Sequence, residues 1–449
     1  MFGSEGMGKR CLVMLTDTYP FAVGEEFIEQ EINQVCAQFD KVVIIPVRVR
    51  QGQAQQTRTL PANAVARLLP PDRIRNWRVK TALYLPKILL RTPSLIANAP
   101  IFQPRRFLMD IRFAANVLAL YRKTRKVVSR RLLSQFDSVV FYAYWMHTPA
   151  VLGCLMREGL LVESGRSAVV ARAHAYDVDE SYAPHHYIPG RRFLLDRLYQ
   201  VYPISNYAAR FLHAHGERHA DQVEVRRLGV PSVPPVQRTN QGQWKLLSCS
   251  HMTPYKRIDL MLEAVAELQA RGHSVHWTHV GEANQQRLDD MRQLARQRLQ
   301  PGTFDFLGHV PNEQARSIYA DPSFTLFLNT SLQEGVPVSI MEAQAASLPV
   351  VATNAGGTAE VVLDGENGSV VAVDSSAKQI ADAIWTVLTL AEGDYRKLVA
   401  AAHAGWQERS NGPSQYRSFA AHLGKLSKAL TTVPRGGGTW VPEVSGDDE

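Results

Sequence analysis

The chain has 449 residues, of which 45% are hydrophobic and 20% are charged. This composition is that of an ordinary globular protein, and the length suggests two domains or more. The apolar runs are too short for a membrane-spanning helix, and residues 1–10 lack the apolar core of a signal peptide. We therefore expect a cytoplasmic protein whose membrane contact, if any, is peripheral. Four scattered cysteines without metal-type spacing are expected to be buried thiols.

The first fifty residues predict a βαβ unit. A short apolar strand at 11–16 is followed by a loop that contains Gly24, then by a helix with Glu25, Glu26 and Glu29 in its early turns, where the helix dipole favours negative charge. A second strand is predicted at 41–47. Ligands bind at the carboxyl ends of such strands, so the loop around Gly24 is a candidate contact; a purely structural turn is the alternative.

Residues 51–135 differ from the rest of the chain in charge. Between Ala66 and Arg131 there are sixteen Lys and Arg but only two Asp, so this segment carries +14 while the whole chain carries +8. Helices are predicted at 73–91 and 107–133, with apolar stripes, basic faces and interleaved aromatic residues. Three interpretations remain open: a solvated helical face, contact with anionic lipid headgroups, and nucleic-acid binding. No nucleic-acid motif accompanies the charge, so we expect no nucleic-acid partner.

Further strands are predicted at 138–143, 168–173, 199–204 and 223–227. His174 directly follows the strand at 168–173, which places it at the ligand-binding end of an α/β sheet; a packed loop histidine is the alternative. Residues 229–243 are rich in Pro, Gly and Gln without periodicity and predict an interdomain linker.

A second domain follows the linker. A strand at 245–249 leads into a loop with His251, Lys256 and Arg257, just before a helix at 258–271. Positive charge at the start of a helix opposes the helix dipole, so an anion is expected there. Later strands are predicted at 275–281 and 303–307, the latter followed by a turn that includes Val310. Later helices are predicted at 284–299, 376–389, 394–409 and 414–430.

An anion site is predicted where an apolar strand at 324–328 leads through a loop into a helix at 338–346. Pro337 suits the first helical position, because its fixed φ fits there and its missing N–H needs no partner. The amides around Gly335, Val336 and Val338 would then be free at the positive end of the helix, where phosphate is the usual anion.

Two carboxylates, Glu334 and Glu342, flank this turn. A carboxylate accepts hydrogen bonds from sugar hydroxyls, which explains acidic residues beside a phosphate site. The alternative is a plain strand–loop–helix connection whose two acidic side chains are solvated.

The stretch from Glu334 to Ala343, followed by 349–353 and 356–360, resembles the donor-site block of retaining glycosyltransferases of family 4. This resemblance implies an α/β fold of the GT-B type, with two facing Rossmann-like domains, a cleft between them and a helical insertion in the N-terminal domain. We expect an acceptor-side domain at 1–235 with the basic insertion at 51–135, and a nucleotide-sugar domain at 236–413. A helix at 414–432 is expected to cross back to the first domain, and 433–449 to be a disordered tail.

The resemblance also implies a reaction: retaining transfer of a sugar from a UDP- or GDP-sugar to a lipid-linked oligosaccharide or polysaccharide acceptor at the cytosolic membrane face, without a metal or other cofactor. Segment 66–131 is then a candidate contact with an anionic membrane surface. In the family, an acidic residue at the position of Glu334 holds the sugar, the one at Glu342 holds the ribose, and a histidine at the position of His174 lines the reacting face. The other implied donor contacts are Gly24, His251, Lys256, Arg257, Val310, Gly335, Val336, Pro337 and Val338.

One departure from the family pattern keeps alternatives open. The family usually has an arginine where this chain has His251, and imidazole lacks the permanent charge and forked geometry of guanidinium. A non-catalytic GT-B scaffold that binds nucleotide is one alternative. A soluble transferase with a small acceptor, as in sucrose-phosphate synthesis, is another.

Overall fold

A computed structural model describes residues 8–432 except 23, 51, 54, 73, 75, 98–102, 160–163, 215–220 and 282–283. The expected disordered tail therefore lies outside the described residues. The chain divides into two compact units. Unit 1 contains Met1–Ile204, Ala208–Arg226 and Tyr416–Glu449, and unit 2 contains Ser205–Tyr207 and Arg227–Gln415.

Unit 1 is built on a parallel six-stranded sheet with the order β3-β2-β1-β4-β5-β6. This is the order of a doubly wound sheet, whose winding direction reverses between β1 and β4. The register places Leu12 of β1 beside Val42 of β2 and beside Val140 of β4. The strands are β1 Arg10–Thr16, β2 Lys41–Pro46, β3 Ala64–Ala66, β4 Ser138–Ala143, β5 Ser167–Ala173 and β6 Gln200–Pro203.

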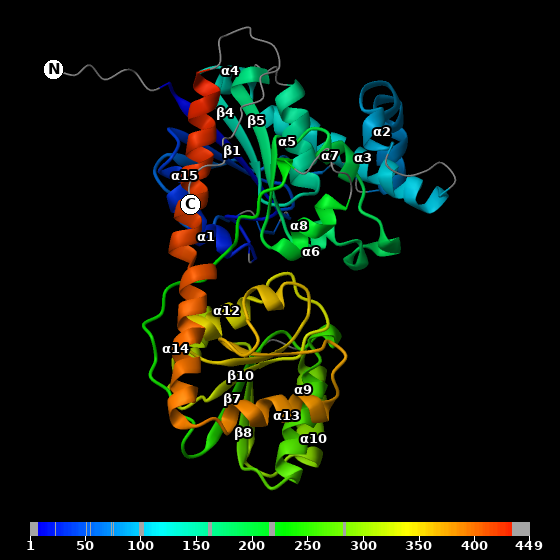
Figure 1. Cartoon of the computed structure of the whole chain (residues 1–449). Coiled ribbons are helices and arrows are strands. Elements are labelled where there is room, and N and C mark those ends of the chain that lie inside the picture. The colour runs from blue at the N-terminus through cyan, green and yellow to red at the C-terminus, as the bar shows by residue number, and fades with distance from the viewer. Residues whose placement is uncertain are drawn as a thin grey trace, which may run out of the picture. The chain divides into compact units, whose positions relative to one another are not determined.

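Helices cover both faces of this sheet (Figure 1). Successive residues of the central strands alternate between two apolar cores, so Val13 packs in one and Leu12 in the other. On one face lie α2 Trp77–Arg91, α3 Pro104–Val127, α4 Arg130–Leu133, α5 Thr148–Gly159, α7 Arg191–Leu195 and α8 Asn206–His213. On the other face lie α1 Phe27–Cys36 and the later part of α15 Gly412–Thr431.

Unit 2 repeats the same strand order around β7 and β10, as β12-β11-β10-β7-β8-β9. Its strands are β7 Trp244–Cys249, β8 Val275–Val280, β9 Phe304–Gly308, β10 Leu326–Asn329, β11 Val350–Thr353 and β12 Gly368–Val371. The helices α9 Ile258–Ala270, α10 Gln285–Arg298 and α13 Ala377–Leu388 pack on one face. The helices α11 Asn312–Tyr319, α12 Val338–Ala345 and α14 Glu392–Arg409 contribute to the core of the other.

Short helical segments complete the described elements: η1 Pro93–Leu95, η2 Ser164–Arg166, α6 Ala175–Val178, η3 Glu180–Tyr182, η4 Pro184–His186, η6 Pro254–Lys256 and η7 Thr358–Glu360. Within the described part of the chain, no helix combines the length and hydropathy that crossing a bilayer requires.

The structure corrects several element predictions in unit 1. The segment predicted as a strand at 223–227 forms only one isolated bridge, between Val201 and Val223. The predicted helix at 107–133 is two helices, because Val128 is extended and Ser129 caps α4 by accepting from the amide of Leu132. The helix predicted from residue 73 begins at Trp77, where the Asn76 side chain accepts from the Arg78 amide.

Candidate active site

The loops that follow β7 and β10 lie together at the topological switch point of unit 2. Neighbouring strands whose crossovers run in opposite directions leave a crevice at their carboxyl ends, where ligands bind. The Leu332 amide donates to the Tyr255 carbonyl at 2.7 Å, and the Thr330 hydroxyl donates to the Lys256 carbonyl at 3.1 Å. The two loops are therefore hydrogen-bonded to each other through backbone groups and the Thr330 hydroxyl, which fixes the side chains they carry.

Glu334 is the centre of this loop pair. Its Oε1 accepts from Lys256 Nζ at 2.6 Å, from Ser331 Oγ at 2.6 Å and from Asn329 Nδ2 at 3.2 Å. Its side chain is nearly buried. None of the described residues donates to the other carboxylate oxygen, Oε2. The site therefore holds a fixed carboxylate with one oxygen left for a ligand.

A group of backbone amides borders this carboxylate. The amides of Gly335, Val336 and Val338 have no hydrogen-bond acceptor among the described residues. The predicted helix starts at Val338 as expected, but Pro337 is its N-cap rather than its first helical residue. The free N–H groups still point out of the positive end of α12, as an anion site requires.

Gly356 and Gly357, which follow β11, pack against the backbone of Glu334 and Gly335. The Gly357 amide donates to the Gly335 carbonyl at 3.1 Å. A Cβ on Gly356, which has a φ of +55°, would lie 1.7 Å from the Glu334 carbonyl oxygen. Any side chain at this position would displace the backbone that carries Glu334.

Arg257 is engaged in holding the same loop. Its Nε donates to the Thr330 carbonyl at 2.6 Å, and its Nη2 lies 3.5 Å from the Ser331 carbonyl. Both basic residues were predicted to meet an anion. Lys256 lies beside the carboxylate and the free amides, whereas the guanidinium of Arg257 donates to backbone carbonyls. A phosphate contact by Arg257 stays a prediction, and these bonds do not favour it.

Two other predicted donor contacts lie on neighbouring loops. His251 is exposed in the loop after β7, and its carbonyl accepts from the Thr253 amide at 2.8 Å. Val310 follows β9 and packs, half-buried, against the core of unit 2. Contact between Val310 and a donor stays a prediction.

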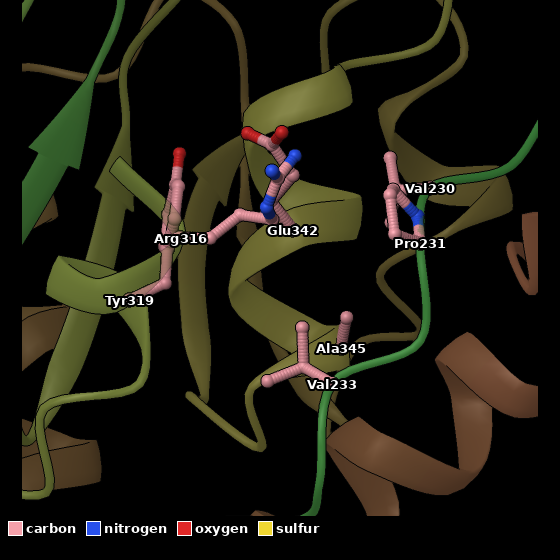
Figure 2. Close-up of a pocket in the computed structure, with 7 residues that line it drawn as sticks. All are labelled: Val230, Pro231, Val233, Arg316, Tyr319, Glu342 and Ala345. Carbon is pink, nitrogen blue, oxygen red and sulfur yellow. The ribbon is translucent and has the colours of Figure 1, made fainter. Parts of the chain in front are cut away.

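Glu342 faces a separate hollow beside α12 (Figure 2). The hollow encloses about 220 Å³ of empty space, part of it open to solvent, and the Arg316 side chain reaches toward the Glu342 carboxyl. Burial raises the pKa of this carboxyl to about 7, while Tyr319 and Arg316 oppose the rise. The Tyr319 hydroxyl lies near the carboxyl without reaching full hydrogen-bond geometry. The lining residues are Val230, Pro231, Val233, Arg316, Tyr319, Glu342 and Ala345.

In unit 1, His174 stands directly after β5 as predicted and is held by Asp177. His174 Nδ1 lies 3.3 Å from Asp177 Oδ2, and the same oxygen accepts from the amides of His174 and Met146. Because a carboxylate only accepts, Nδ1 carries the hydrogen in the neutral ring and Nε2 is the bare acceptor. Nε2 is buried and has no hydrogen-bond partner among the residues that the structure describes. The histidine thus keeps one nitrogen for a donor such as a hydroxyl.

Glu25 has a role that the sequence prediction missed. It was expected in the early turns of a helix, but α1 begins at Phe27 and Glu25 lies before it with a φ of +60°. Its carboxylate accepts from the amides of Asp17, Thr18 and Tyr19 and from the Trp145 indole. These loop amides have left the sheet ladder, and a carboxylate satisfies them together.

The Trp145 ring that Glu25 holds packs on the His174 ring, with centroids 4.1 Å apart. The Gly24 amide donates to Glu26 at 2.8 Å, and its φ of +102° explains why glycine stands there. Contact between Gly24 and a donor stays a prediction.

His147 and Asp17 are further candidates that sequence reasoning overlooked. His147 Nδ1 accepts from the Thr148 amide at 2.7 Å, and burial lowers the pKa of the ring to about 4, so its Nε2–H faces the Tyr176 hydroxyl at 2.5 Å. Burial raises the pKa of Asp17 to about 7, although Arg48 lies 3.2 Å away. His147 lies in the loop after β4, and Asp17 directly follows β1. The rule that ligands bind at the carboxyl ends of strands, which selected His174, therefore also indicates these two residues.

Asp177 and Asp179 form an Asp-x-Asp pair shortly after β5. Asp177 holds His174, and Asp179 Oδ1 accepts from the Ser181 amide at 2.8 Å. Among the described residues, no group of three or more His, Cys, Asp or Glu side chains is placed to hold a metal ion.

Comparisons with known proteins agree with the geometry of unit 2. Residues 231–403 match the family model described as glycosyl transferases group 1. The chain is 26% identical over 245 residues to the putative colanic acid biosynthesis glycosyltransferase WcaL of Salmonella typhimurium, covering 53% of this chain and 58% of that protein. It is 26% identical over 306 residues to a GDP-mannose-dependent alpha-(1-6)-phosphatidylinositol monomannoside mannosyltransferase of Mycolicibacterium smegmatis, covering 63% and 76%.

The chain spans only 58% and 52% of the length of two of these curated relatives, WcaL and the amylovoran biosynthesis glycosyltransferase AmsK of Erwinia amylovora. Solved structures cover more of it. Anabaena Alr3699/HepE in complex with UDP and glucose matches with a TM-score of 0.60 at 16% identity, over 93% of this chain and 100% of that one. Sucrose-phosphate synthase from Thermosynechococcus elongatus matches with a TM-score of 0.64 at 13% identity, over 94% and 99%. At these identities the likeness shows the fold alone.

The predicted α/β fold of the GT-B type is thus confirmed by two six-stranded parallel sheets of the same order and by these structural neighbours. The resemblance to glycosyltransferases is confirmed by the family model and by the curated relatives. Residues 231–403, which make up most of unit 2, are thus similar to the group 1 glycosyl transferases.

Proposed function

We propose that the protein is a retaining glycosyltransferase that moves a sugar from a UDP- or GDP-sugar to a lipid-linked oligosaccharide or polysaccharide acceptor. One observation carries the proposal: the carboxylate of Glu334, paired with Lys256, stands beside the free amides at the start of α12. Relatives named for colanic acid biosynthesis, amylovoran biosynthesis and transfer to a phosphatidylinositol monomannoside support the acceptor class.

The amides and Lys256 suit the leaving group. When the bond between the anomeric carbon and the diphosphate breaks, its electron pair stays on the diphosphate, and catalysis needs positive charge there. The ammonium of Lys256 has three donors and spends one on Glu334. Its remaining donors and the free amides of Gly335, Val336 and Val338 would bind the phosphate oxygens.

Glu334 suits the sugar. Its free oxygen, Oε2, would accept from a sugar hydroxyl, and its negative charge would stabilise the positive charge that develops at the anomeric carbon. Because three hydrogen bonds fix Oε1, the carboxylate is positioned before the nucleotide sugar binds. This preorganisation is what gives electrostatic catalysis its advantage over water.

Retention of configuration follows if the acceptor oxygen attacks from the face that the diphosphate leaves. The acceptor hydroxyl forms the new bond to the anomeric carbon while its proton passes to the departing phosphate oxygen. His174 would line this face, with its bare Nε2 accepting from a hydroxyl. Glu342 would bind the ribose hydroxyls, as the resemblance implies.

We further propose that the reaction needs no metal ion and takes place at the cytosolic face of a membrane, where segment 66–131 meets anionic lipid. The metal proposal rests on the family resemblance and on the positive field that Lys256 and the end of α12 supply. A chelator should leave transfer unchanged. Loss of transfer that added Mg²⁺ or Mn²⁺ restores would overturn this part of the proposal.

The test is a thermal-shift panel of UDP- and GDP-sugars, followed by product analysis. A bound donor stabilises the protein by mass action, by about 2.7 kcal/mol at a hundredfold excess over Kd. The nucleotide sugar that raises the unfolding midpoint should also release its nucleotide, and NMR of the product should show the anomeric configuration of the donor. Binding without any turnover would favour a non-catalytic scaffold, and an inverted product would exclude the retaining mechanism.

A further inference from the structure

Helix α2 has two apolar faces, of which only one is covered. Tyr84 and Ile88 are its buried residues and pack into the core of unit 1. On the opposite side, Val79, Leu83 and Leu90 are 55%, 47% and 83% exposed. These positions follow the i, i+4, i+11 spacing of one helix face. A helix on the surface of a globular protein normally presents polar residues on that face, so the exposed stripe calls for an occupant.

Cations flank this stripe. Arg78, Lys87 and Arg91 are exposed, and none of them forms an ion pair with a described residue. The guanidinium of Arg78 lies 5.7 Å from the centre of the Trp77 ring, and the Lys87 ammonium lies 5.5 Å from the centre of the Tyr84 ring. Helix α2 contains no acidic residue. The exposed face is therefore apolar along its middle and cationic along its margins.

The surroundings leave this charge uncompensated. Asp110, the acidic residue of the neighbouring helix α3, is buried and accepts from the Tyr187 hydroxyl at 2.6 Å. Asp72 is bonded to Lys80 at 2.7 Å and lies 3.8 Å from Lys123. The structure thus removes Lys80 from the cations that are free to meet an anionic partner.

We propose that this face of α2, made of Val79, Leu83, Leu90, Arg78, Lys87 and Arg91, docks onto an anionic lipid surface. The helix lies in the plane of the membrane, with its leucines at the boundary of headgroups and acyl chains and its cations at the lipid phosphates. The purpose of the docking rests on the proposed function, because a lipid-linked acceptor has to be reached at a membrane. The binding itself can be measured without donor or acceptor.

The combination of groups selects this occupant. A nucleic acid would match the cations but would offer no apolar phase to the exposed leucines. A second copy of the chain would bring the same three cations against each other without an acid to separate them. A lipid surface with anionic headgroups offers both environments: its acyl chains suit the exposed apolar side chains, and its headgroup phosphates suit the flanking cations.

The test is co-sedimentation of the full chain with vesicles of phosphatidylcholine alone and of phosphatidylcholine mixed with phosphatidylglycerol. The protein should pellet only with the anionic vesicles and should be released as salt is raised. A variant with Leu83→Asn and Leu90→Asn keeps the charge, and one with Arg78→Gln, Lys87→Gln and Arg91→Gln keeps the leucines. Each should lose about tenfold in vesicle affinity, since both apolar burial and charge contribute.

A charge-matched control comes from the same basic segment: Lys126→Gln, Arg130→Gln and Arg131→Gln remove three exposed cations outside α2. This control should lose about twofold or less if the α2 face makes the contact rather than the net charge of the segment. An equal loss in the control, parent-like binding of the leucine variant, equal pelleting with neutral vesicles, or no pelleting at all would each overturn the proposal.

Two measurements keep the outcomes separate. All substituted positions are exposed, so thermal unfolding should match that of the parent and confirm folding. The thermal shift with a nucleotide sugar should also persist in every variant. Lost vesicle binding with intact donor binding concerns the docking face alone, whereas lost donor binding with intact vesicle binding concerns the proposed transferase.

Discussion

Glu334 is the residue on which the proposed chemistry depends most. Replacing it by Gln keeps the shape of the side chain but removes the charge next to the reacting sugar. We expect Glu334→Gln to slow transfer at least about tenfold, equivalent to about 1.4 kcal/mol of barrier, with a smaller change in donor affinity. Steady-state kinetics together with calorimetric donor binding would measure both.

The matched control for this substitution is Glu366→Gln, which removes an exposed carboxylate from a turn of the same unit. It should leave turnover unchanged. Near-normal turnover of Glu334→Gln with unchanged donor binding would show that this carboxylate plays no part in catalysis.

Glu342 predicts a pH dependence of stability. Its carboxyl pKa rises from 4.5 to about 7 in the folded protein, so between these values the folded state binds more protons than the unfolded state. The free energy of unfolding should therefore fall as pH rises through this window. Gln cannot ionise, so Glu342→Gln should gain stability relative to the parent between pH 5 and pH 8. Urea unfolding at both values checks this, and parallel pH curves for the two proteins would contradict it.

At the scale of elements, the site depends on two loops that bond to each other. The Lys256–Glu334 pair spans 78 residues of sequence and joins the loop after β7 to the loop after β10. Removing the cation leaves a nearly buried carboxylate with only Ser331 and Asn329 as donors. The sequence predicts only a donor contact for Lys256, and the structure adds this ion pair.

We therefore expect Lys256→Ala to affect both stability and donor affinity. The unfolding free energy should fall by about 1–3 kcal/mol, because a buried charge loses its partner. Binding of UDP or GDP should weaken as well, because positive charge is lost beside the free amides. Lys378→Ala, on the exposed start of α13, is the control. Equal nucleotide affinity in the Lys256 variant and the parent, by calorimetry, would refute the phosphate contact.

At the scale of the whole molecule, each unit has its own sheet and its own apolar cores. Helix α15 begins in unit 2, and its residues from Tyr416 onward belong to unit 1. Phe419 of this helix packs edge-to-face on Tyr142 and Tyr202, with ring centroids 5.5 Å and 5.1 Å apart. The Arg172 guanidinium lies 4.0 Å from the centre of its ring.

Phe419→Ala should accordingly destabilise unit 1 by about 3–5 kcal/mol through the cavity it leaves. Hydrogen exchange should accelerate across strands β1 to β6 and stay unchanged across β7 to β12. Lys428→Ala, at an exposed position of the same helix, should change neither. A uniform loss of protection in both units would mean that the two units unfold as one cooperative body.

The sequence by itself determined the elements around the site. Apolar runs flanked by turn residues located most strands of both sheets. The carboxyl-end rule selected His174, and the predicted helix starts selected the loops of Lys256 and Glu334. These inferences succeed because strand burial, turn chemistry and helix starts depend on residues close together in the chain. Short features without a period were missed, such as the three-residue strand β3.

Only the tertiary structure decided which polar groups meet. In the folded protein Glu334 forms an ion pair with Lys256, and Lys80 forms one with Asp72. The Glu25 carboxylate accepts from amides of the loop after β1 instead of standing in the first turn of a helix. These contacts depend on strand order and on backbone angles such as the positive φ of Glu25. No local pattern encodes them, because the partners are brought together by the packing of the whole sheet and not by their spacing along the chain.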